Sequence, residues 1–251
     1  METVLEIKQA YKAFDGFVAI NDVTIDLKRG EKHAIIGPNG AGKTTLFNLI
    51  TGHLKVDRGS VTFEGKEITG TPPHRIVKLG LARSFQRINI YPRMTVFENV
   101  QVALIARDGR SFHLFTLGHA LNRDESAELL ALVGLSAEAE ELAGELAYGK
   151  QKQLELAISL ASHPSVLLLD EPTAGMSPPE TVEAIKLIEE IAEARGLALL
   201  FTEHDMGVVF GISDRISVLH HGELIFSGAP DRVREDPEVR RVYLGESHGA
   251  A

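Results

Sequence analysis

Residues 146–172 limit the possible fold and function of this chain more than any other stretch. It reads LAYGKQKQLELAISLASHPSVLLLDEP, and its apolar strand, Val166 to Leu169, is followed at once by Asp170 and Glu171. The start of the stretch predicts a glycine turn at Gly149 that opens a long amphipathic helix. A phosphate-binding loop alone occurs in many classes of nucleotide enzyme. Far fewer classes combine such a helix with an apolar strand and two adjacent acids at this distance.

A second motif lies upstream, where GPNGAGKTT matches G-x-x-x-x-G-K-[ST]. An apolar strand, His33 to Ile36, precedes it, and we expect a helix from Lys43 to Thr51 to follow. Glycines let backbone N–H groups wrap phosphate oxygens, and the helix N-terminus adds its dipole. We expect Lys43 to reach the β and γ phosphates of a nucleotide and the Thr44 hydroxyl to bind Mg²⁺; the alternative is a glycine-rich turn with an incidental lysine. The predicted nucleotide-binding residues are Gly37, Pro38, Asn39, Gly40, Ala41, Gly42, Lys43, Thr44 and Thr45.

The paired acids suit two tasks at such a site. In P-loop ATPases an acid at this strand end holds Mg²⁺, which predicts that role for Asp170. Glu171 can polarise the attacking water as a general base. The alternative, a solvated pair of carboxylates or a helix cap, loses weight beside the phosphate-binding motif. His204 follows the expected strand Ala198 to Phe201 at the same sheet edge, where it can bind the γ-phosphate and position Glu171; only its position distinguishes it among 10 histidines.

Three further residues carry weaker signals. Gln86 follows an expected apolar strand from Leu79 to Phe85, and its side chain can bind Mg²⁺ or a water. The residues alone favour an ordinary strand-end glutamine. Tyr11 and Phe14 precede the second expected strand, and either ring can stack on adenine. Without further context, ordinary sheet packing is the favoured interpretation of both rings.

Composition excludes several classes of function. Asp and Glu number 35 against 26 Lys and Arg, and the net charge of −9 argues against general nucleic-acid binding. Without cysteine there is no disulfide framework, thiolate chemistry or Cys-ligated zinc. The start, METVLEIKQAYK, lacks the apolar core of a signal peptide. No window of about 18 apolar residues predicts a membrane span, so we expect any membrane role to come through a partner.

The order of strands and helices predicts one α/β domain with an inserted helical part. Alternating segments at Val4–Ile7 and Val18–Leu27, with a hairpin at Glu64–Lys66, predict an antiparallel sheet. Helical spacing dominates from about Thr95 to Ala161. Strands then alternate with helices, which predicts a parallel core sheet.

We therefore expect a single domain over residues 1–251. Residues 1–87 and 163–251 form its α/β core and β subdomain, and residues 88–162 form a helical lobe. The segment from Gly109 to Gly118 predicts a loop in that lobe. A helix from Pro178 to Arg195 is expected to begin with a capping box at Ser177 and to turn four residues toward the core: Val182, Ile185, Ile188 and Ile191. The tail from Ala229 predicts one or two helices.

Together these motifs resemble the nucleotide-binding subunit of an ATP-binding cassette (ABC) transporter. The resemblance covers about residues 4–245 in the family's order: an aromatic residue, the P-loop, a glutamine, a helical lobe, a signature loop, LLLDEP and a histidine. It implies a P-loop NTPase core of ABC ATPase type with an antiparallel β subdomain and an inserted helical lobe. It also implies that Phe14, 23 positions before Gly37, stacks on adenine. Gln86 and His204 take metal-binding and catalytic roles beside Asp170.

One motif departs from the family pattern. The usual signature is LSGGQ, whose serine touches the γ-phosphate bound to the opposite subunit. Here alanine and tyrosine replace the serine and the first glycine. LAYG resembles ATPases of branched-chain amino acid importers, as do TEHDM, GISDRI, VYLGE and AGMS in place of SALD. That group also includes ATPases of importers for urea and for small organic acids or amides. The signature loop comprises Leu146, Ala147, Tyr148, Gly149, Lys150 and Gln151.

The resemblance also implies partners. Two subunits, identical or related, bind ATP and Mg²⁺ at a shared face, with the P-loop of one against the signature loop of the other. Integral membrane permease subunits insert a short helix near Gln86 to Met94. A periplasmic or extracellular solute-binding protein is an indirect partner, and nucleic acid is not a partner. The subunit is expected in the cytoplasm, peripheral on the inner face of the cell membrane.

Two other classes are weighed against this reading. Soluble ABC ATPases of translation or DNA repair resemble tandem cassettes or carry long coiled coils, and this sequence has neither. A P-loop GTPase or small-molecule kinase would make LAYGKQ an accident, and the guanine-reading NKxD motif does not occur.

Overall fold

Two sheets organise the molecule. The computed structural model describes residues 2–84, 89–109 and 122–244. The strands in this part of the chain are β1 (Thr3–Phe14), β2 (Phe17–Lys28), β3 (Lys32–Ile36), β4 (Arg58–Phe63), β5 (Lys66–Glu67), β6 (Leu81–Ser84), β7 (Val166–Asp170), β8 (Ala198–Thr202), β9 (Arg215–His220) and β10 (Glu223–Gly228). They form a sheet of order β2-β1-β4-β5 and a sheet of order β10-β9-β3-β8-β7-β6.

The larger sheet is parallel except for β10, which pairs antiparallel with β9. Its central strands are apolar runs because both faces are covered. On β7, Val166 and Leu168 pack with β1, β2 and α1, whereas Leu167 and Leu169 pack with α3 to α7. The smaller sheet is antiparallel throughout. Both predicted sheets are therefore confirmed.

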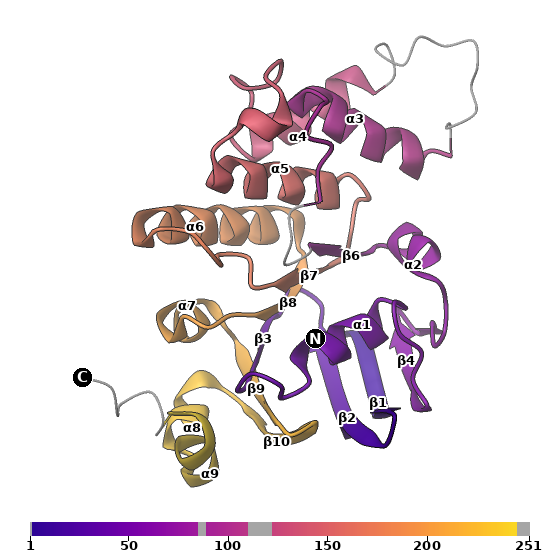
Figure 1. The fold of residues 1–251 in the computed structure, drawn as a ribbon, viewed down its shortest axis with the longest axis vertical. Helices are drawn as coiled ribbons and strands as arrows, with labels where there is room; N and C mark the ends of the chain where they lie inside the picture. Colours follow the sequence, from indigo (N-terminus) through magenta and orange to yellow (C-terminus); the bar gives the residue numbers. More distant parts are fainter. Residues whose placement is uncertain (1, 85–88, 110–121, 245–251) are drawn as a thin grey trace.

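The helices cover the sheets and build a separate end of the molecule. Their bounds are α1 (Lys43–Ile50), α2 (Pro73–Leu79), α3 (Val96–Arg107), α4 (Arg123–Leu132), α5 (Tyr148–Leu160), α6 (Pro178–Arg195), α7 (Met206–Ile212), α8 (Pro230–Glu235) and α9 (Pro237–Val239), with a 3-10 turn at Ala143–Glu145 and a π-helical turn at Arg240–Leu244. Figure 1 shows α3, α4 and α5 gathered at one end and α8 and α9 at the other.

Three helices thus occupy the predicted helical lobe, while its division at residues 88 and 163 remains a proposal. Residues 110–118 of the expected loop lie outside the described residues. Within the described ranges, no helix is both long and apolar enough to cross a lipid bilayer.

The predicted start of the strand before Gln86 is wrong. Leu79 ends α2 rather than starting a strand, because Pro73 begins a short helix and Gly80, at φ +103°, ends it. Strand β6 begins only at Leu81; Phe85 lies outside the described residues.

The helix α6 buries three of its four expected core residues. Val182 is 67% exposed, whereas Ile185, Ile188 and Ile191 are buried. Each step of three residues rotates about 60° short of a full circle, because one turn contains 3.6 residues. Residues spaced by three therefore wind around the helix, and Val182 lies on the side opposite Ile191.

A buried histidine connects the two sheets. The Nε2 atom of His33 on β3 lies 2.8 Å from the Ser217 hydroxyl, which in turn lies 2.8 Å from the Ser227 hydroxyl. Its Nδ1 atom lies 3.2 Å from the carbonyl oxygen of Asp26 on β2. Burial, followed by the nearby charge of Arg215, lowers the pKa of His33 to about 3.

This shift predicts an acid-sensitive fold. Because the His33 pKa is about 3 in the folded protein against 6.5 for the ordinary group, only the unfolded chain takes up this proton between these values. The free energy of unfolding should fall as pH drops below 6.5, by up to about 1.4 kcal/mol per pH unit for this group. Denaturant titrations of His33→Gln should show a shallower pH dependence between about pH 6 and pH 4.5.

The chosen pH range separates His33 from its neighbour. Arg215 lowers the pKa of Asp26 below 3.8, so that carboxylate loses its stabilisation only at lower pH. Equal slopes for the wild type and His33→Gln would contradict the prediction.

Candidate functional site

Close backbone contacts fix the path of the phosphate-binding loop between β3 and α1. Gly37 has φ +151°, and a Cβ there would lie 2.1 Å from the carbonyl oxygen of Leu219 on β9. Gly42 has φ +106°, and a Cβ there would lie 2.7 Å from the carbonyl oxygen of Ala19 on β2. A side chain at either position would collide with a neighbouring strand. Gly37 and Gly42 therefore permit the loop to pack directly against the backbones of β9 and β2.

The helix α1 begins directly after this loop. Gly42 is its N-cap, and no described side chain caps the first turn. The N–H groups of Lys43, Thr44 and Thr45 consequently have no acceptor within the helix. Free donors at a helix N-terminus suit phosphate oxygens.

The ammonium of Lys43 folds back over the loop. Its Nζ donates to the carbonyl oxygens of Gly37 at 2.6 Å and Pro38 at 3.2 Å. Burial lowers the pKa of Lys43, although the carboxylates of Glu171 and Asp170 act in the opposite direction. The loop follows β3, and the two acids lie at and directly after the end of β7. Because β8 lies between these parallel strands, the loop and the acids share one edge of the sheet.

Both carboxylate oxygens of Asp170 are hydrogen-bonded. Oδ1 accepts from the hydroxyl of Thr202 on β8 at 2.9 Å, and Oδ2 accepts from Nη2 of Arg83 on β6 at 2.8 Å. The Arg83–Asp170 ion pair is buried, with side chains 6% and 4% exposed. Each carboxylate oxygen has a second lone pair, so these contacts orient Asp170 and leave it able to bind a further group.

Glu171 occupies a strained position directly after β7. Its φ is +52°, in the left-handed region that residues with side chains rarely adopt. The backbone oxygen and hydroxyl of Thr202 both accept from its N–H, each at 3.1 Å. Its Oε1 lies 2.8 Å from Nε2 of His204. The fold thus joins the predicted base and the predicted histidine, and strain of this kind clusters at functional sites.

The sequence prediction missed Glu203. This buried acid accepts from the N–H of Thr173 at 2.9 Å, from its hydroxyl at 2.7 Å and from the N–H of His204 at 3.1 Å. It therefore ties the loop after β7 to the loop after β8. The available signal was an acid in TEHD directly after an apolar strand. The sequence prediction also missed Thr202, the first residue of the same TEHD segment, which contacts Asp170 and Glu171.

The aromatic residues differ in their surroundings. Phe14 ends β1 opposite Phe17 and is 40% exposed, with Nζ of Lys12 5.3 Å from its ring centroid. The ring of Tyr11 instead lies 4.0 Å from the guanidinium carbon of Arg58. Of the two rings predicted to stack on adenine, Phe14 is therefore the exposed one. Phe17 adds a second exposed ring to the same hairpin.

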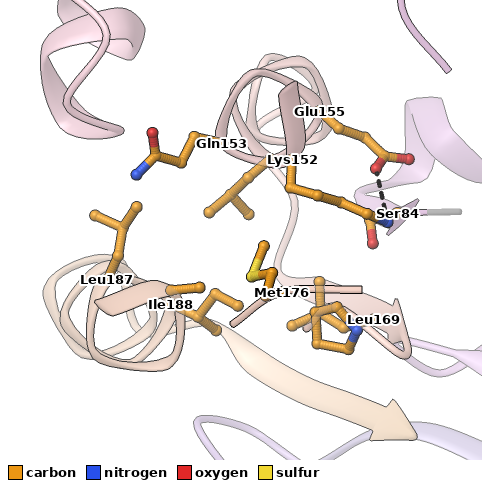
Figure 2. A pocket seen from close by; sticks show the side chains of 11 residues that line it. Ser84, Lys152, Gln153, Glu155, Leu169, Met176, Leu187 and Ile188 are labelled. Carbon is orange, nitrogen blue, oxygen red and sulfur yellow. Dashed lines mark ion pairs between the residues drawn. The ribbon is translucent and has the colours of Figure 1, made fainter. Parts of the chain in front are cut away.

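Gln86 lies outside the described residues, so its predicted role stays a prediction. The strand before it ends at Ser84, beside a pocket between α5, α6 and β7. Figure 2 shows Lys152 and Glu155 of α5 in this pocket, joined by an ion pair of 3.5 Å. Met176, from the loop after β7, faces the same space. This pocket lies where α5, the helix that begins in the signature loop, meets the core sheet.

The signature loop forms the first turn of a helix. Helix α5 begins at Tyr148 with Ala147 as N-cap, so the predicted glycine turn at Gly149 is wrong. Gly149 instead permits a close approach, since a Cβ there would lie 3.3 Å from Oε1 of Glu180. Alanine cannot supply the hydroxyl that a serine N-cap offers. The first-turn N–H groups of α5 are accordingly without a side-chain cap in the described structure.

Contacts with the core anchor this first turn. The hydroxyl of Tyr148 donates to the carbonyl oxygen of Ala174 at 3.1 Å, and its ring lies 3.4 Å from the place of a Cβ at Gly175. Nε2 of Gln151 donates to the carbonyl oxygen of Leu146 at 3.0 Å, and a further ion pair joins Lys150 to Glu138. The tyrosine thus links the signature loop to the loop after LLLDEP.

The site fits a magnesium ion that is shared with phosphate. Within the described ranges, no group of three or more His, Asp or Glu side chains is arranged to hold a metal alone. Mg²⁺ usually takes one or two protein ligands and completes its shell with phosphate oxygens and water. Thr44 at the start of α1 and Asp170 at the end of β7 supply hard oxygen donors of this kind.

The sequence matches two families. Residues 20–174 match the ABC transporter family, and residues 223–249 match the family described as branched-chain amino acid ATP-binding cassette transporter. The chain is 38% identical to the high-affinity branched-chain amino acid transport ATP-binding protein LivG of Salmonella typhimurium, over 98% of this chain and 99% of that protein. It is 37% identical to the corresponding protein BraF of Pseudomonas aeruginosa, with 97% and 98% covered.

Solved structures agree with this result. An ATP-binding cassette of an ABC transporter in its ADP conformation superposes with a TM-score of 0.87 at 31% identity, covering 98% of this chain and all of that one. A dimeric ATP-binding cassette in a post-hydrolysis state, bound to ADP and Pi, gives a TM-score of 0.76 at 25% identity, with 90% and 98% covered. The chain therefore belongs to the ABC transporter family, as an ATP-binding cassette that hydrolyses ATP.

Proposed function

We propose that this protein powers an importer of branched-chain amino acids or a related small polar solute. The observation that carries its catalytic part is the meeting of the P-loop, Asp170 and the Glu171–His204 pair at one edge of the parallel sheet. The solute class is supported by the relatives LivG and BraF, whose names specify branched-chain amino acid transport. The family match over residues 223–249 supports the same class.

The residues divide the reaction into separate tasks. The N–H groups at the start of α1 bind the phosphates of ATP, and Lys43 exchanges its two carbonyl partners for phosphate oxygens. Thr44, Asp170 and Gln86 would hold Mg²⁺, which would supply neutralisation of the phosphate charge. Glu171 takes a proton from the attacking water. His204 keeps Glu171 oriented and hydrogen-bonds the γ-phosphate, and Phe14 stacks on adenine.

A second subunit, identical or related, completes the site. The uncapped first turn of α5 presents N–H donors and the positive end of the helix dipole. The γ-phosphate bound to the opposite subunit suits this environment. Because Ala147 has no hydroxyl, we assign that contact to backbone N–H groups around Gly149.

Permease subunits are the proposed membrane partners, and they place this protein on the inner face of the cell membrane. A cavity of about 390 Å³ separates α2 and β6 of the core from α3 and α5 of the lobe. His74 and Lys78 line it on the core side. Ala82 and Arg83 of β6 also line it, and they precede the predicted docking segment in the sequence. Residues 86–88 of that segment lie outside the described structure.

The function is tested with the neighbouring transport subunits. We expect the protein to copurify with the permeases encoded beside it, and their solute-binding protein to bind leucine, isoleucine or valine. Binding of urea or a small amide alone would retain the transport function and change the solute. Absence of any permease complex would favour a soluble ATPase.

Replacement of the proposed base should separate binding from turnover. Glu171→Gln keeps the size of the side chain and can still contact His204, but it cannot accept the proton from water. ATP hydrolysis should fall at least about 100-fold. ATP affinity should stay within about twofold of wild type, and ATP should trap a dimer that light scattering detects.

The control for this variant is Glu190→Gln. Glu190 is exposed on α6 in a surface pair with Lys186, so its loss should leave turnover unchanged. Hydrolysis at the wild-type rate by Glu171→Gln would remove Glu171 as the base.

A charge in the signature loop should block the cross-subunit contact. In Gly149→Asp the new carboxylate faces both the opposing γ-phosphate and Glu180, whose Oε1 lies 3.3 Å from the Cβ position. Hydrolysis should be lost while ATP binding to the subunit's own P-loop persists, as nucleotide fluorescence can measure. Ala147→Ser, which adds a favoured N-cap, should keep turnover. Normal hydrolysis by Gly149→Asp would argue against the shared site.

A further inference from the structure

The mechanism above does not use Arg83, although this residue touches the site. It lies on β6 in register with Leu168 of β7, and its side chain is buried. Its Nη2 donates to Oδ2 of Asp170 at 2.8 Å. The guanidinium of arginine holds its N–H donors in a rigid planar fork. One terminal nitrogen can therefore bind a carboxylate while the other binds a different element of the fold.

The other end of the fork is fixed to α1. Nη1 of Arg83 donates to Oδ1 of Asn48 at 2.7 Å and lies 3.4 Å from the hydroxyl of Thr51. The guanidinium carbon lies 5.6 Å from the ring centroid of Phe47. Because α1 is the helix that starts in the phosphate-binding loop, Arg83 joins that helix to the carboxylate at the end of β7.

Asp170 is therefore held from both neighbouring strands. Thr202 of β8 binds Oδ1 at 2.9 Å, and Arg83 of β6 binds Oδ2. A rotation of the carboxylate would break both contacts. With Arg83 removed, Thr202 alone would hold the group.

We propose that Arg83 is the positioning residue that orients Asp170 for the magnesium ion of the bound nucleotide. The inference rests on the proposed function, because it takes Asp170 as a metal ligand. The lone pairs of Asp170 not used by Thr202 and Arg83 would then be available to the cation. In this assignment Arg83 acts through Asp170 and not as a ligand of the metal or of ATP.

Cation affinity, measured apart from turnover, tests this role. In a Glu171→Gln background saturated with ATP, Mn²⁺ replaces Mg²⁺ and free Mn²⁺ is counted by electron paramagnetic resonance. Arg83→Gln should weaken Mn²⁺ binding about tenfold, as is typical when a partner that orients a ligand is lost. ATP affinity in EDTA should change less than about twofold, since the phosphate-binding loop is intact.

Further variants separate positioning from general damage. Arg83→Lys keeps the charge but not the fork, so its Mn²⁺ affinity should lie between wild type and Arg83→Gln. Asn48→Ala removes the second anchor of the guanidinium and should weaken Mn²⁺ in the same direction; it carries the test if Arg83→Gln does not fold. Arg107→Gln breaks an ion pair with Glu125 in the lobe and should leave Mn²⁺ affinity unchanged.

Asp170→Asn distinguishes the two levels of failure. If it weakens Mn²⁺ binding while Arg83→Gln and Asn48→Ala do not, the inference about Arg83 is overturned and the metal role of Asp170 stands. If none of the three weakens Mn²⁺ binding, the metal site in the proposed function fails. Equal losses of Mn²⁺ and metal-free ATP affinity in Arg83→Gln would also overturn the positioning role.

Discussion

The site depends on three parallel strands that end at the same edge of one sheet. β3, β8 and β7 are consecutive neighbours and all run parallel. Ligands of open α/β sheets bind at the carboxyl ends of the strands, and here these ends lead to the phosphate-binding loop, His204 and the acid pair. Each strand is buried on both faces, so a slip of one residue would exchange the two core clusters. Packing of the sheet thereby fixes the geometry of the site.

Buried polar contacts hold the proposed catalytic groups in place relative to the sheet. Thr202 binds both Asp170 and the backbone of Glu171, and Glu203 binds Thr173 and the backbone of His204. Buried polar groups require such partners. Because these contacts are already made, Asp170, Glu171 and His204 need little rearrangement when ATP binds, which is the basis of electrostatic preorganisation.

The helical lobe is anchored to the core at the signature loop. Its signature loop is the start of α5, and the contact of Tyr148 with Ala174 ties that start to the core of the same subunit. The tyrosine thus replaces a family glycine with a side chain that has its own anchor. The departure from LSGGQ removes one hydroxyl and adds a link to the loop that follows Asp170 and Glu171.

The sequence by itself determined the features that short stretches of neighbouring residues encode. The P-loop, Asp170–Glu171 and the two sheets follow from motif spacing and apolar periodicity over short stretches. Helix α2 and the exposure of Val182 escaped because a seven-residue helix is short for its periodicity and residues spaced by three wind around a helix. Only the tertiary structure decided what holds Asp170, since Thr202 and Arg83 lie 32 and 87 positions away. Their contacts arise from the register between strands, and that register is set by packing across the whole sheet.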